Sequence, residues 1–361
     1  MELIPFQNWD EKLKNNKNLF IAGPCSAENR NQLVETALEI SQNQKVKIFR
    51  AGVWKPRTTP NSFEGVGEKA LDWLKEVKQK TDLLTCVEIA TPKHLEICLK
   101  NKGAVDVFWI GARTVANPFA LQALADALKG VDVPVMVKNP VIPDLKLWIG
   151  AIERLYKNGI NKIAAIHRGF YPFEETRYRN IPKWELIVNL KMQLPQLQII
   201  GDPSHIAGKT ELIEEVSALF MSMNVDGLMI ETHNNPNKAL SDAKQQVTPA
   251  QLNQLLEKLN FEKISTSSFN TEIKQLRIGI DSIDFQILDM LSQRFDIVEK
   301  IGAYKYNNNI SVLQLDRWRK IIKSRLKVAK ELNLELNFTK KIMQLVHKES
   351  IEIQSKICKN L

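Results

Sequence analysis

The sequence has few cysteines, four in 361 residues. Cys25, Cys86, Cys98 and Cys358 are too sparse for the disulfide framework of a small secreted domain. The N-terminal residues also lack the charged and then apolar pattern of a signal peptide. We therefore expect a protein of the reducing cytoplasm.

Long hydrophobic runs are also missing. No window approaches the ~18 consecutive apolar residues that a membrane-spanning helix needs, so no membrane partner is predicted. With 44% hydrophobic and 25% charged residues, the composition is that of a soluble globular protein. The length suits one large domain and a smaller one.

The net charge is +9, which has three explanations: a lysine-rich proteome, nucleic acid, or anionic small substrates. Most Lys and Arg residues alternate with Asp and Glu on expected helical faces. No basic run carries the interspersed aromatic residues that stack on bases. We therefore predict no nucleic-acid partner, and the motifs described next favour anionic substrates.

The first part of the sequence alternates short apolar runs with longer amphipathic stretches. The runs cover residues 19–22, 46–49, 83–89, 105–110, 135–137, 162–166, 197–200 and 227–230. Such alternation predicts a parallel sheet with buried strands. Eight repeats in this length predict a closed (β/α)₈ barrel over residues 1–262.

The last part of the sequence lacks proline and has only two glycines, Gly279 and Gly302. A Ser/Thr-rich stretch, residues 263–270, reads as a linker before it. Apolar residues then recur at helical spacing and predict an all-α domain over residues 271–361. Three helices are expected: the first ends near Tyr306, the second covers about residues 315–332, and the third covers about residues 338–356.

Chemistry in such a barrel gathers at the C-terminal ends of the strands. Six cations follow the expected strands: Arg50, Lys55, Arg57, Arg113, Lys138 and Arg168. They would repel one another unless they bind anions, and Arg and Lys both suit phosphate and carboxylate. A substrate pair that carries at least two phosphates would account for so many cations.

A second group at the strand ends consists of Cys25, His205, Glu231 and Asp242. Thiolate, imidazole and carboxylates are ligands for a divalent transition metal. The last strand closes against the first, so these residues become neighbours in a barrel. His233 is an alternative to His205 as the imidazole ligand.

Six motifs occur in order along the barrel: Gly23-Pro24-Cys25-Ser26, Lys55-Pro56-Arg57-Thr58, Gly111-Ala112-Arg113, His167-Arg168-Gly169, Gly201-Asp202-Pro203-Ser204-His205, and Asp226-Gly227 with Glu231, His233 and Asp242. Together they resemble 3-deoxy-7-phosphoheptulonate (DAHP) synthases of the type Iβ group. The resemblance spans nearly all of residues 1–262. It implies condensation of phosphoenolpyruvate with erythrose 4-phosphate, the first step of the shikimate pathway.

The resemblance also implies roles for single residues. Cys25, His205, Glu231 and Asp242 match the metal ligands, with Mn²⁺ expected and Fe²⁺, Co²⁺ or Zn²⁺ as alternatives. The phosphoenolpyruvate clamp is implied at Gly111, Ala112, Arg113, Lys138 and Arg168, with Arg50 and Lys55 nearby. The erythrose 4-phosphate loop is implied at Lys55, Pro56, Arg57 and Thr58. The metal would polarise the aldehyde, and Lys55 would donate a proton to the alkoxide.

In the helical part, Arg294 and Lys305 are eleven residues apart and share a helix face. Arg277 lies seventeen residues before Arg294, which is roughly 25 Å along one helix. One small ligand cannot touch both arginines in a single chain. If both serve one site, Arg277 comes from a second protomer, which predicts a homodimer through this domain.

Six positions of this part, Arg277, Arg294, Lys305, Arg317, Ser350 and Gln354, resemble the all-helical chorismate mutases over about residues 271–358. The resemblance implies that the arginines bind the two carboxylates of chorismate. Lys305 and Gln354 would then donate hydrogen bonds to the ether oxygen during rearrangement to prephenate. Gln314 and Trp318 stand where some members carry Asp and Glu.

Two alternatives remain open from the sequence. The barrel is also similar to synthases of 3-deoxy-octulosonate 8-phosphate, although those typically have another sequence at Lys55-Pro56-Arg57-Thr58. The helical part is alternatively a regulatory or dimerisation module without its own catalysis. We expect prephenate to inhibit the barrel through this part.

Overall fold

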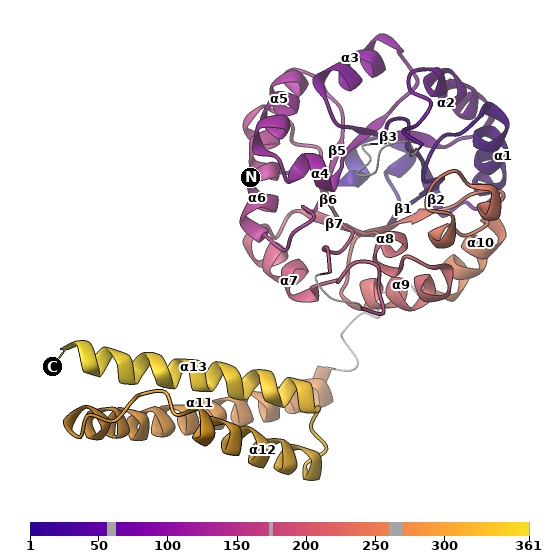
Figure 1. The fold of residues 1–361 in the computed structure, drawn as a ribbon. Coiled ribbons are helices and arrows are strands. Elements are labelled where there is room, and N and C mark those ends of the chain that lie inside the picture. Colours follow the sequence, from indigo (N-terminus) through magenta and orange to yellow (C-terminus); the bar gives the residue numbers. More distant parts are fainter. Residues whose placement is uncertain (56–62, 173–175, 260–269, 361) are drawn as a thin grey trace. The chain divides into compact units, whose positions relative to one another are not determined.

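The computed structural model describes residues 1–55, 63–172, 176–259 and 270–360, and their side chains except at 270–275 and 358–360. The chain divides into two compact units, Met1–Glu262 and Lys263–Leu361 (Figure 1). The first unit combines strands with helices, and the described residues of the second form helices alone. The predicted linker, residues 263–270, lies outside the described residues except for Asn270.

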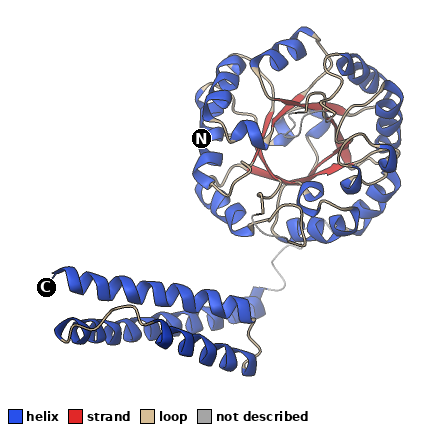
Figure 2. Cartoon of the chain, viewed as in Figure 1, coloured by secondary structure: helices blue, strands red, loops and turns tan. Residues whose placement is uncertain are grey.

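Eight parallel strands form a closed barrel in the first unit, in the order of the sequence. They are β1 (Leu19–Gly23), β2 (Val46–Ala51), β3 (Leu84–Ile89), β4 (Val107–Ile110), β5 (Val135–Lys138), β6 (Ile163–His167), β7 (Gln198–Gly201) and β8 (Gly227–Glu231). Figure 2 shows the strands as an inner ring with helices outside it. The predicted (β/α)₈ barrel is confirmed.

Helices follow the strands around the barrel. The longer ones are α1 (Arg30–Ser41), α2 (Lys69–Lys80), α3 (Pro92–Lys100), α5 (Pro118–Leu128), α6 (Leu145–Lys157), α7 (Trp184–Gln193), α9 (Ile213–Ser222) and α10 (Pro249–Lys258). Local sequence sets several starts. The Asn29 side chain accepts the Gln32 amide at the start of α1, and Thr248 forms a capping box with Gln251 at the start of α10.

The strands are buried on both faces. Inside the barrel, Ile48, Trp109 and Met136 belong to one apolar cluster, and a second cluster fills the space between strands and helices. The short helices η1 (Phe6–Asn8) and η2 (Glu11–Leu13) add buried side chains to the inner cluster. Burial on both faces explains why the strands read as continuous apolar runs rather than alternating ones.

Four strands begin later than their apolar runs predicted, and the largest difference is in β4, which starts at Val107 rather than Val105. The Asp106 carboxylate accepts the Thr85 amide at 2.8 Å and pairs with Lys78 at 2.5 Å. These side-chain interactions add to the hydrogen bond that the Asp106 amide donates to the Thr85 carbonyl at 2.9 Å.

The second unit consists of α11 (Asn270–Asn307), α12 (Leu315–Glu331) and α13 (Leu336–Asn360). These bounds agree with the predicted helices to within a few residues. Asn309 and Asn333, which lie in the two connections, have φ angles of 52° and 56° in the left-handed region, where Asn is better tolerated than most residues. No helix of the described residues is long and apolar enough to cross a membrane.

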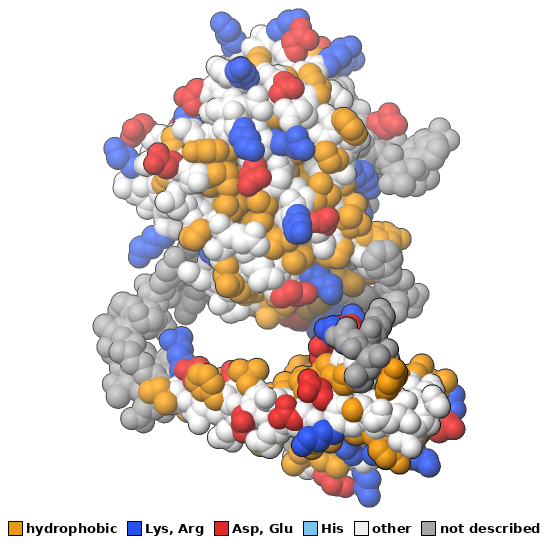
Figure 3. Space-filling view, turned by 90° about the vertical axis from the view of Figure 1, so that its left-hand side faces the viewer, with side chains coloured by type: hydrophobic (Ala, Val, Ile, Leu, Met, Phe, Trp, Pro, Cys, Tyr) orange, Lys and Arg blue, Asp and Glu red, His pale blue; other side chains and the backbone are white. Residues whose placement is uncertain are grey.

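The helical unit exposes much apolar surface (Figure 3). On α11 the exposed apolar residues include Leu276, Ile280, Ile283, Ile287, Met290, Ile297 and Ile301. They recur at spacings of three, four or seven residues and therefore form one stripe along the helix, here called the α11 stripe. Ile287 is 52% exposed and Met290 57% exposed.

Candidate active site

A cavity of about 330 Å³ lies at the C-terminal ends of the barrel strands. Eight residues predicted from the sequence line it: Lys55, Gly111, Ala112, Arg113, Lys138, Arg168, His205 and Asp242. They follow six different strands, so the barrel brings together side chains far apart in the sequence. Pro56, Arg57 and Thr58 lie outside the described residues.

Cys25, Glu231 and Asp242 offer ligand atoms that all lie within 4.8 Å of one another. The pairing of β1 with β8 aligns Gly23 with Glu231 and so carries Cys25 to that carboxylate. Gly23 has φ +142°, and a Cβ there would lie 2.1 Å from the Arg50 carbonyl oxygen, so glycine is required for this approach.

His205 borders this cluster. Its Nε2 lies 3.8 Å from Glu231 Oε1, while Nδ1 lies 2.8 Å from Asp202 Oδ2. A carboxylate at Nδ1 holds the proton there and leaves the Nε2 lone pair facing Glu231. His233 faces elsewhere: its Nε2 lies 3.7 Å from Glu28, and its Nδ1 accepts the Asn235 amide.

Arg50 lies beneath the cavity and is almost fully buried, as is Glu231. Arg50 Nη2 is 3.0 Å from Glu231 Oε1, and the guanidinium lies over the Trp109 ring. The pair satisfies the distance of an ion pair but not the geometry of a hydrogen bond, so Glu231 Oε1 is left without a hydrogen-bond donor. A buried carboxylate oxygen without a donor is suited to a cation.

Lys55 and Cys25 are in direct contact, with Nζ 2.8 Å from Sγ. Burial and the Glu231 charge raise the pKa of the Cys25 thiol to about 12. Burial alone would lower the pKa of Lys55, but Cys25 and Glu231 raise it above the usual value. Lys55 is therefore a protonated amine beside the cluster.

Three further residues that the sequence analysis did not assign complete the site. Asp202 is fully buried and bridges Lys138, at 3.0 Å, to His205. Arg179 contacts Asp242 Oδ1 at 3.0 Å, and Asn180 accepts Arg168 Nη1 at 2.8 Å. Asp202 lay within a recognised motif, whereas Arg179 and Asn180 lie in an irregular loop with no periodic signal.

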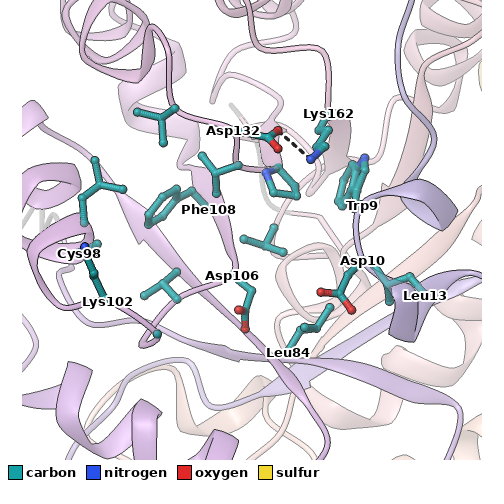
Figure 4. Close-up of a pocket in the computed structure, with 17 residues that line it drawn as sticks. Trp9, Asp10, Leu13, Leu84, Cys98, Lys102, Asp106, Phe108, Asp132 and Lys162 are labelled. Carbon is teal, nitrogen blue, oxygen red and sulfur yellow. Dashed lines mark ion pairs between the residues drawn. The ribbon is translucent and has the colours of Figure 1, made fainter.

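A larger cavity, of about 520 Å³, lies among the starts of β3, β4 and β5 (Figure 4). Trp9, Asp106 and Phe108 line it, together with the Asp132–Lys162 ion pair of 2.7 Å. Reactions in (β/α)₈ enzymes take place at the opposite end. The smaller cavity, at that opposite end, is therefore the candidate active site.

In the helical unit, Arg294 of α11 donates to Ser350 Oγ of α13 at 2.7 Å. Gln354 Nε2 donates to the Ser350 carbonyl, and Lys305 donates to the Val312 carbonyl at 2.8 Å. Arg294, Ser350 and Gln354 thus form one group between α11 and α13, whereas Lys305 contacts the connection between α11 and α12. Arg277 and Arg317 are exposed.

A closed barrel with anion-binding cations and a thiol–carboxylate cluster defines a (β/α)₈ synthase for phosphorylated substrates. Comparison with known proteins makes this specific. Residues 10–268 match the DAHP synthetase I family, and residues 276–355 match chorismate mutase type II. The chain belongs to the DAHP synthetase I family and joins it to a chorismate mutase domain.

The chain is similar to a phospho-2-dehydro-3-deoxyheptonate aldolase of Thermotoga maritima, with 34% identity over 65% of this chain and 67% of that protein. A crystal structure of the Thermotoga maritima aldolase (DAHP synthase) superposes with a TM-score of 0.60 at 30% identity, covering 74% of this chain and 71% of that one. A 2-dehydro-3-deoxyphosphooctonate aldolase of Desulfotalea psychrophila is 26% identical over 67% of this chain and 88% of its own length.

The protein is therefore an enzyme with two activities: DAHP synthase, the first shikimate step, and chorismate mutase, which converts chorismate to prephenate. Synthases of this family generally depend on a metal, and the Cys25, Glu231 and Asp242 cluster is a candidate site for it.

Proposed function

We propose that the 330 Å³ cavity holds phosphoenolpyruvate and erythrose 4-phosphate during the condensation. Arg113, Lys138 and Arg168 bind the phosphate and carboxylate of phosphoenolpyruvate, with Gly111 and Ala112 at the wall. Burial lowers the pKa of Arg168 to about 10, so it stays charged at neutral pH. The observation that carries this proposal is the convergence of these cations on one cavity beside the thiol–carboxylate cluster.

The erythrose 4-phosphate loop, with Pro56, Arg57 and Thr58, remains a prediction. Arg50 acts from below the cavity, where its charge balances Glu231 at 3.0 Å. If both substrates are held by cations, the reacting carbons meet in one orientation, which lowers the entropic part of the barrier.

The metal is held by Cys25, His205, Glu231 and Asp242, and we propose Mn²⁺, with Fe²⁺, Co²⁺ or Zn²⁺ as alternatives. The mixed sulfur, nitrogen and oxygen donors, and the Glu231 oxygen that accepts no hydrogen bond, support this assignment. A bound divalent ion supplies Lewis acidity toward the aldehyde oxygen. Lys55 holds the proton that the new alkoxide takes, since its raised pKa keeps it charged beside Cys25.

In the helical domain, Arg294, Arg317 and Ser350 bind the carboxylates of chorismate, and Lys305 and Gln354 stabilise its ether oxygen. Arg277 reaches the site from a second copy of the chain. The α11 stripe supports this homodimer, because soluble monomers rarely expose so much contiguous apolar surface. We further propose that prephenate inhibits the synthase by binding this domain, and that the enzyme works in the cytoplasm.

The metal role is tested by Cys25→Ala, with Cys98→Ala as the matched control because Cys98 is also buried but lies on α3, away from the cluster. We expect Cys25→Ala to lose condensation activity by at least ~100-fold and to bind Mn²⁺ more weakly in a chelator competition. Cys98→Ala keeps both properties. Full activity of metal-stripped Cys25→Ala protein would refute the metal role.

A further inference from the structure

The helical domain contains a buried imidazole nitrogen that no described residue satisfies. His347 of α13 has a buried Nε2 without a hydrogen-bond partner. The ring is stacked on Trp318 of α12, with centroids 4.0 Å apart and planes 8° apart. Stacking fixes the plane of the imidazole, and Nε2 lies in that plane.

His347 lies in the same row as two proposed mutase residues. His347, Ser350 and Gln354 are spaced i, i+3 and i+7 along α13, which places them on one helix face. Arg294 donates to Ser350 in the middle of this row. Gln354 Oε1, at the far end, is a second buried polar atom without a partner. Two such atoms on either side of one arginine contact indicate a ligand that supplies the missing partners.

The charge of His347 narrows the choice of partner. Burial lowers the pKa of its imidazole, and the cations Arg294 and Lys305 lower it further. The ring is therefore neutral at pH 7, and Nε2 can donate to or accept from a neutral group. Chorismate has two carboxylates, an ether oxygen and a ring hydroxyl. The cations Arg294 and Lys305 suit the carboxylates and the ether oxygen. The ring hydroxyl is then the group that suits a neutral imidazole.

We propose that His347 is a substrate-binding residue of the mutase, whose Nε2 forms a hydrogen bond with the ring hydroxyl of chorismate. Trp318 is a positioning residue that holds the imidazole through the stack. The inference rests on the mutase site proposed above and adds a specificity-determining contact to it. In this arrangement His347 of α13, stacked on Trp318, provides the polar contact to the ring hydroxyl.

The test uses the full chain with His347→Phe, which keeps an aromatic ring against Trp318 and removes the nitrogens. Mutase kcat/KM is measured with chorismate and with an analogue that lacks the ring hydroxyl. We expect the value for chorismate to fall about 10-fold, which is ~1.4 kcal/mol of transition-state stabilisation, and the value for the analogue to stay within about twofold of native. Synthase activity reports that the barrel is folded, and retained mutase activity with the analogue reports that the helical domain is folded.

An equal loss with both substrates would overturn the proposal, because it would mean that His347 acts only on structure. No loss with chorismate would overturn it as well. Should His347→Phe fail to fold, His347→Asn is measured in the same way. His94→Phe is the matched control, since His94 stacks on Trp54 at 4.3 Å and 7° in the barrel, and it leaves both mutase values unchanged. Failure of the mutase function itself would differ: the native chain would then convert neither substrate.

Discussion

Cys25 and Glu231 meet where the barrel closes, and burial determines the chemistry of both. The Cys25 thiol, with its pKa raised to about 12, keeps its proton at neutral pH until a cation competes for the sulfur. The neighbouring His205, Arg50 and Lys55 hold the pKa of Glu231 below its usual value against the effect of burial. The cluster thus combines an ionised carboxylate with a thiol that would lose its proton to a bound metal, as the proposed function requires.

The sequence placed these residues correctly at strand ends, because a motif after an apolar run marks the C-terminal edge of a parallel strand. It did not reveal the contacts between them. Asp202 and Arg179 act through other side chains, Lys138 and Asp242, whose proximity depends on tertiary structure. Such partners leave no spacing signal in one sequence.

His167 gives a pH prediction at the residue scale. Burial lowers the pKa of its imidazole to about 4. The hydrogen bond that Nε2 donates to the Pro182 carbonyl raises the pKa, and of the nearby charges Arg168 lowers it and Asp202 raises it. The folded pKa is below the unfolded value of about 6.5. Neutral His167 therefore contributes fully to the free energy of unfolding above pH ~6.5. This contribution is lost as the pH falls toward 4, at up to ~1.4 kcal/mol per pH unit.

Urea unfolding of the barrel at several pH values between 7 and 4.5 measures this effect. We expect His167→Gln, which keeps a donor but cannot titrate, to lose less unfolding free energy across this range than the native chain. Parallel curves for the two proteins would contradict the assignment.

At the element scale, periodic segments were predictable and irregular ones were not. The eight strands and three C-terminal helices follow from apolar spacing. Burial explains that spacing in the strands, whereas much of the apolar surface of α11 is exposed in the single chain. The segment after β6 has no such pattern. There Phe170 pairs with Ile181 in an isolated antiparallel bridge, and this bridge brings Arg179 and Asn180 back to the cavity.

The α11 stripe gives the element-scale prediction. Ile287→Glu places a charge in the proposed dimer interface on both copies, and burying Ile is worth ~2 kcal/mol per copy. We expect the dimer dissociation constant to rise by at least ~100-fold, with loss of mutase activity because Arg277 no longer reaches a second copy. Sedimentation velocity measures the change.

The control for the dimer prediction is Lys300→Glu, another charge change at an exposed position of α11. It leaves the dimer intact. A native chain that sediments as a monomer at micromolar concentration, or an Ile287→Glu protein that remains a dimer, would exclude this interface.

At the scale of the whole molecule, two catalytic domains of one pathway share a chain. Feedback by prephenate through the helical domain predicts that Arg294→Gln, made in the full chain, weakens prephenate binding and relieves inhibition of the synthase at least ~10-fold. Arg319→Gln is the control, because Arg319 is 78% exposed and pairs only loosely with Asp316 at 3.4 Å. Inhibition that persists unchanged in Arg294→Gln would place the prephenate site elsewhere.

The most direct test of the central claim is the choice of aldehyde by the barrel. The native chain is assayed for phosphate release from phosphoenolpyruvate with erythrose 4-phosphate and with arabinose 5-phosphate, each with Mn²⁺ and with a chelator. We expect kcat/KM to favour erythrose 4-phosphate by roughly 100-fold or more, and the chelator to abolish the reaction. A preference for arabinose 5-phosphate, or undiminished condensation in the chelator, would contradict the account.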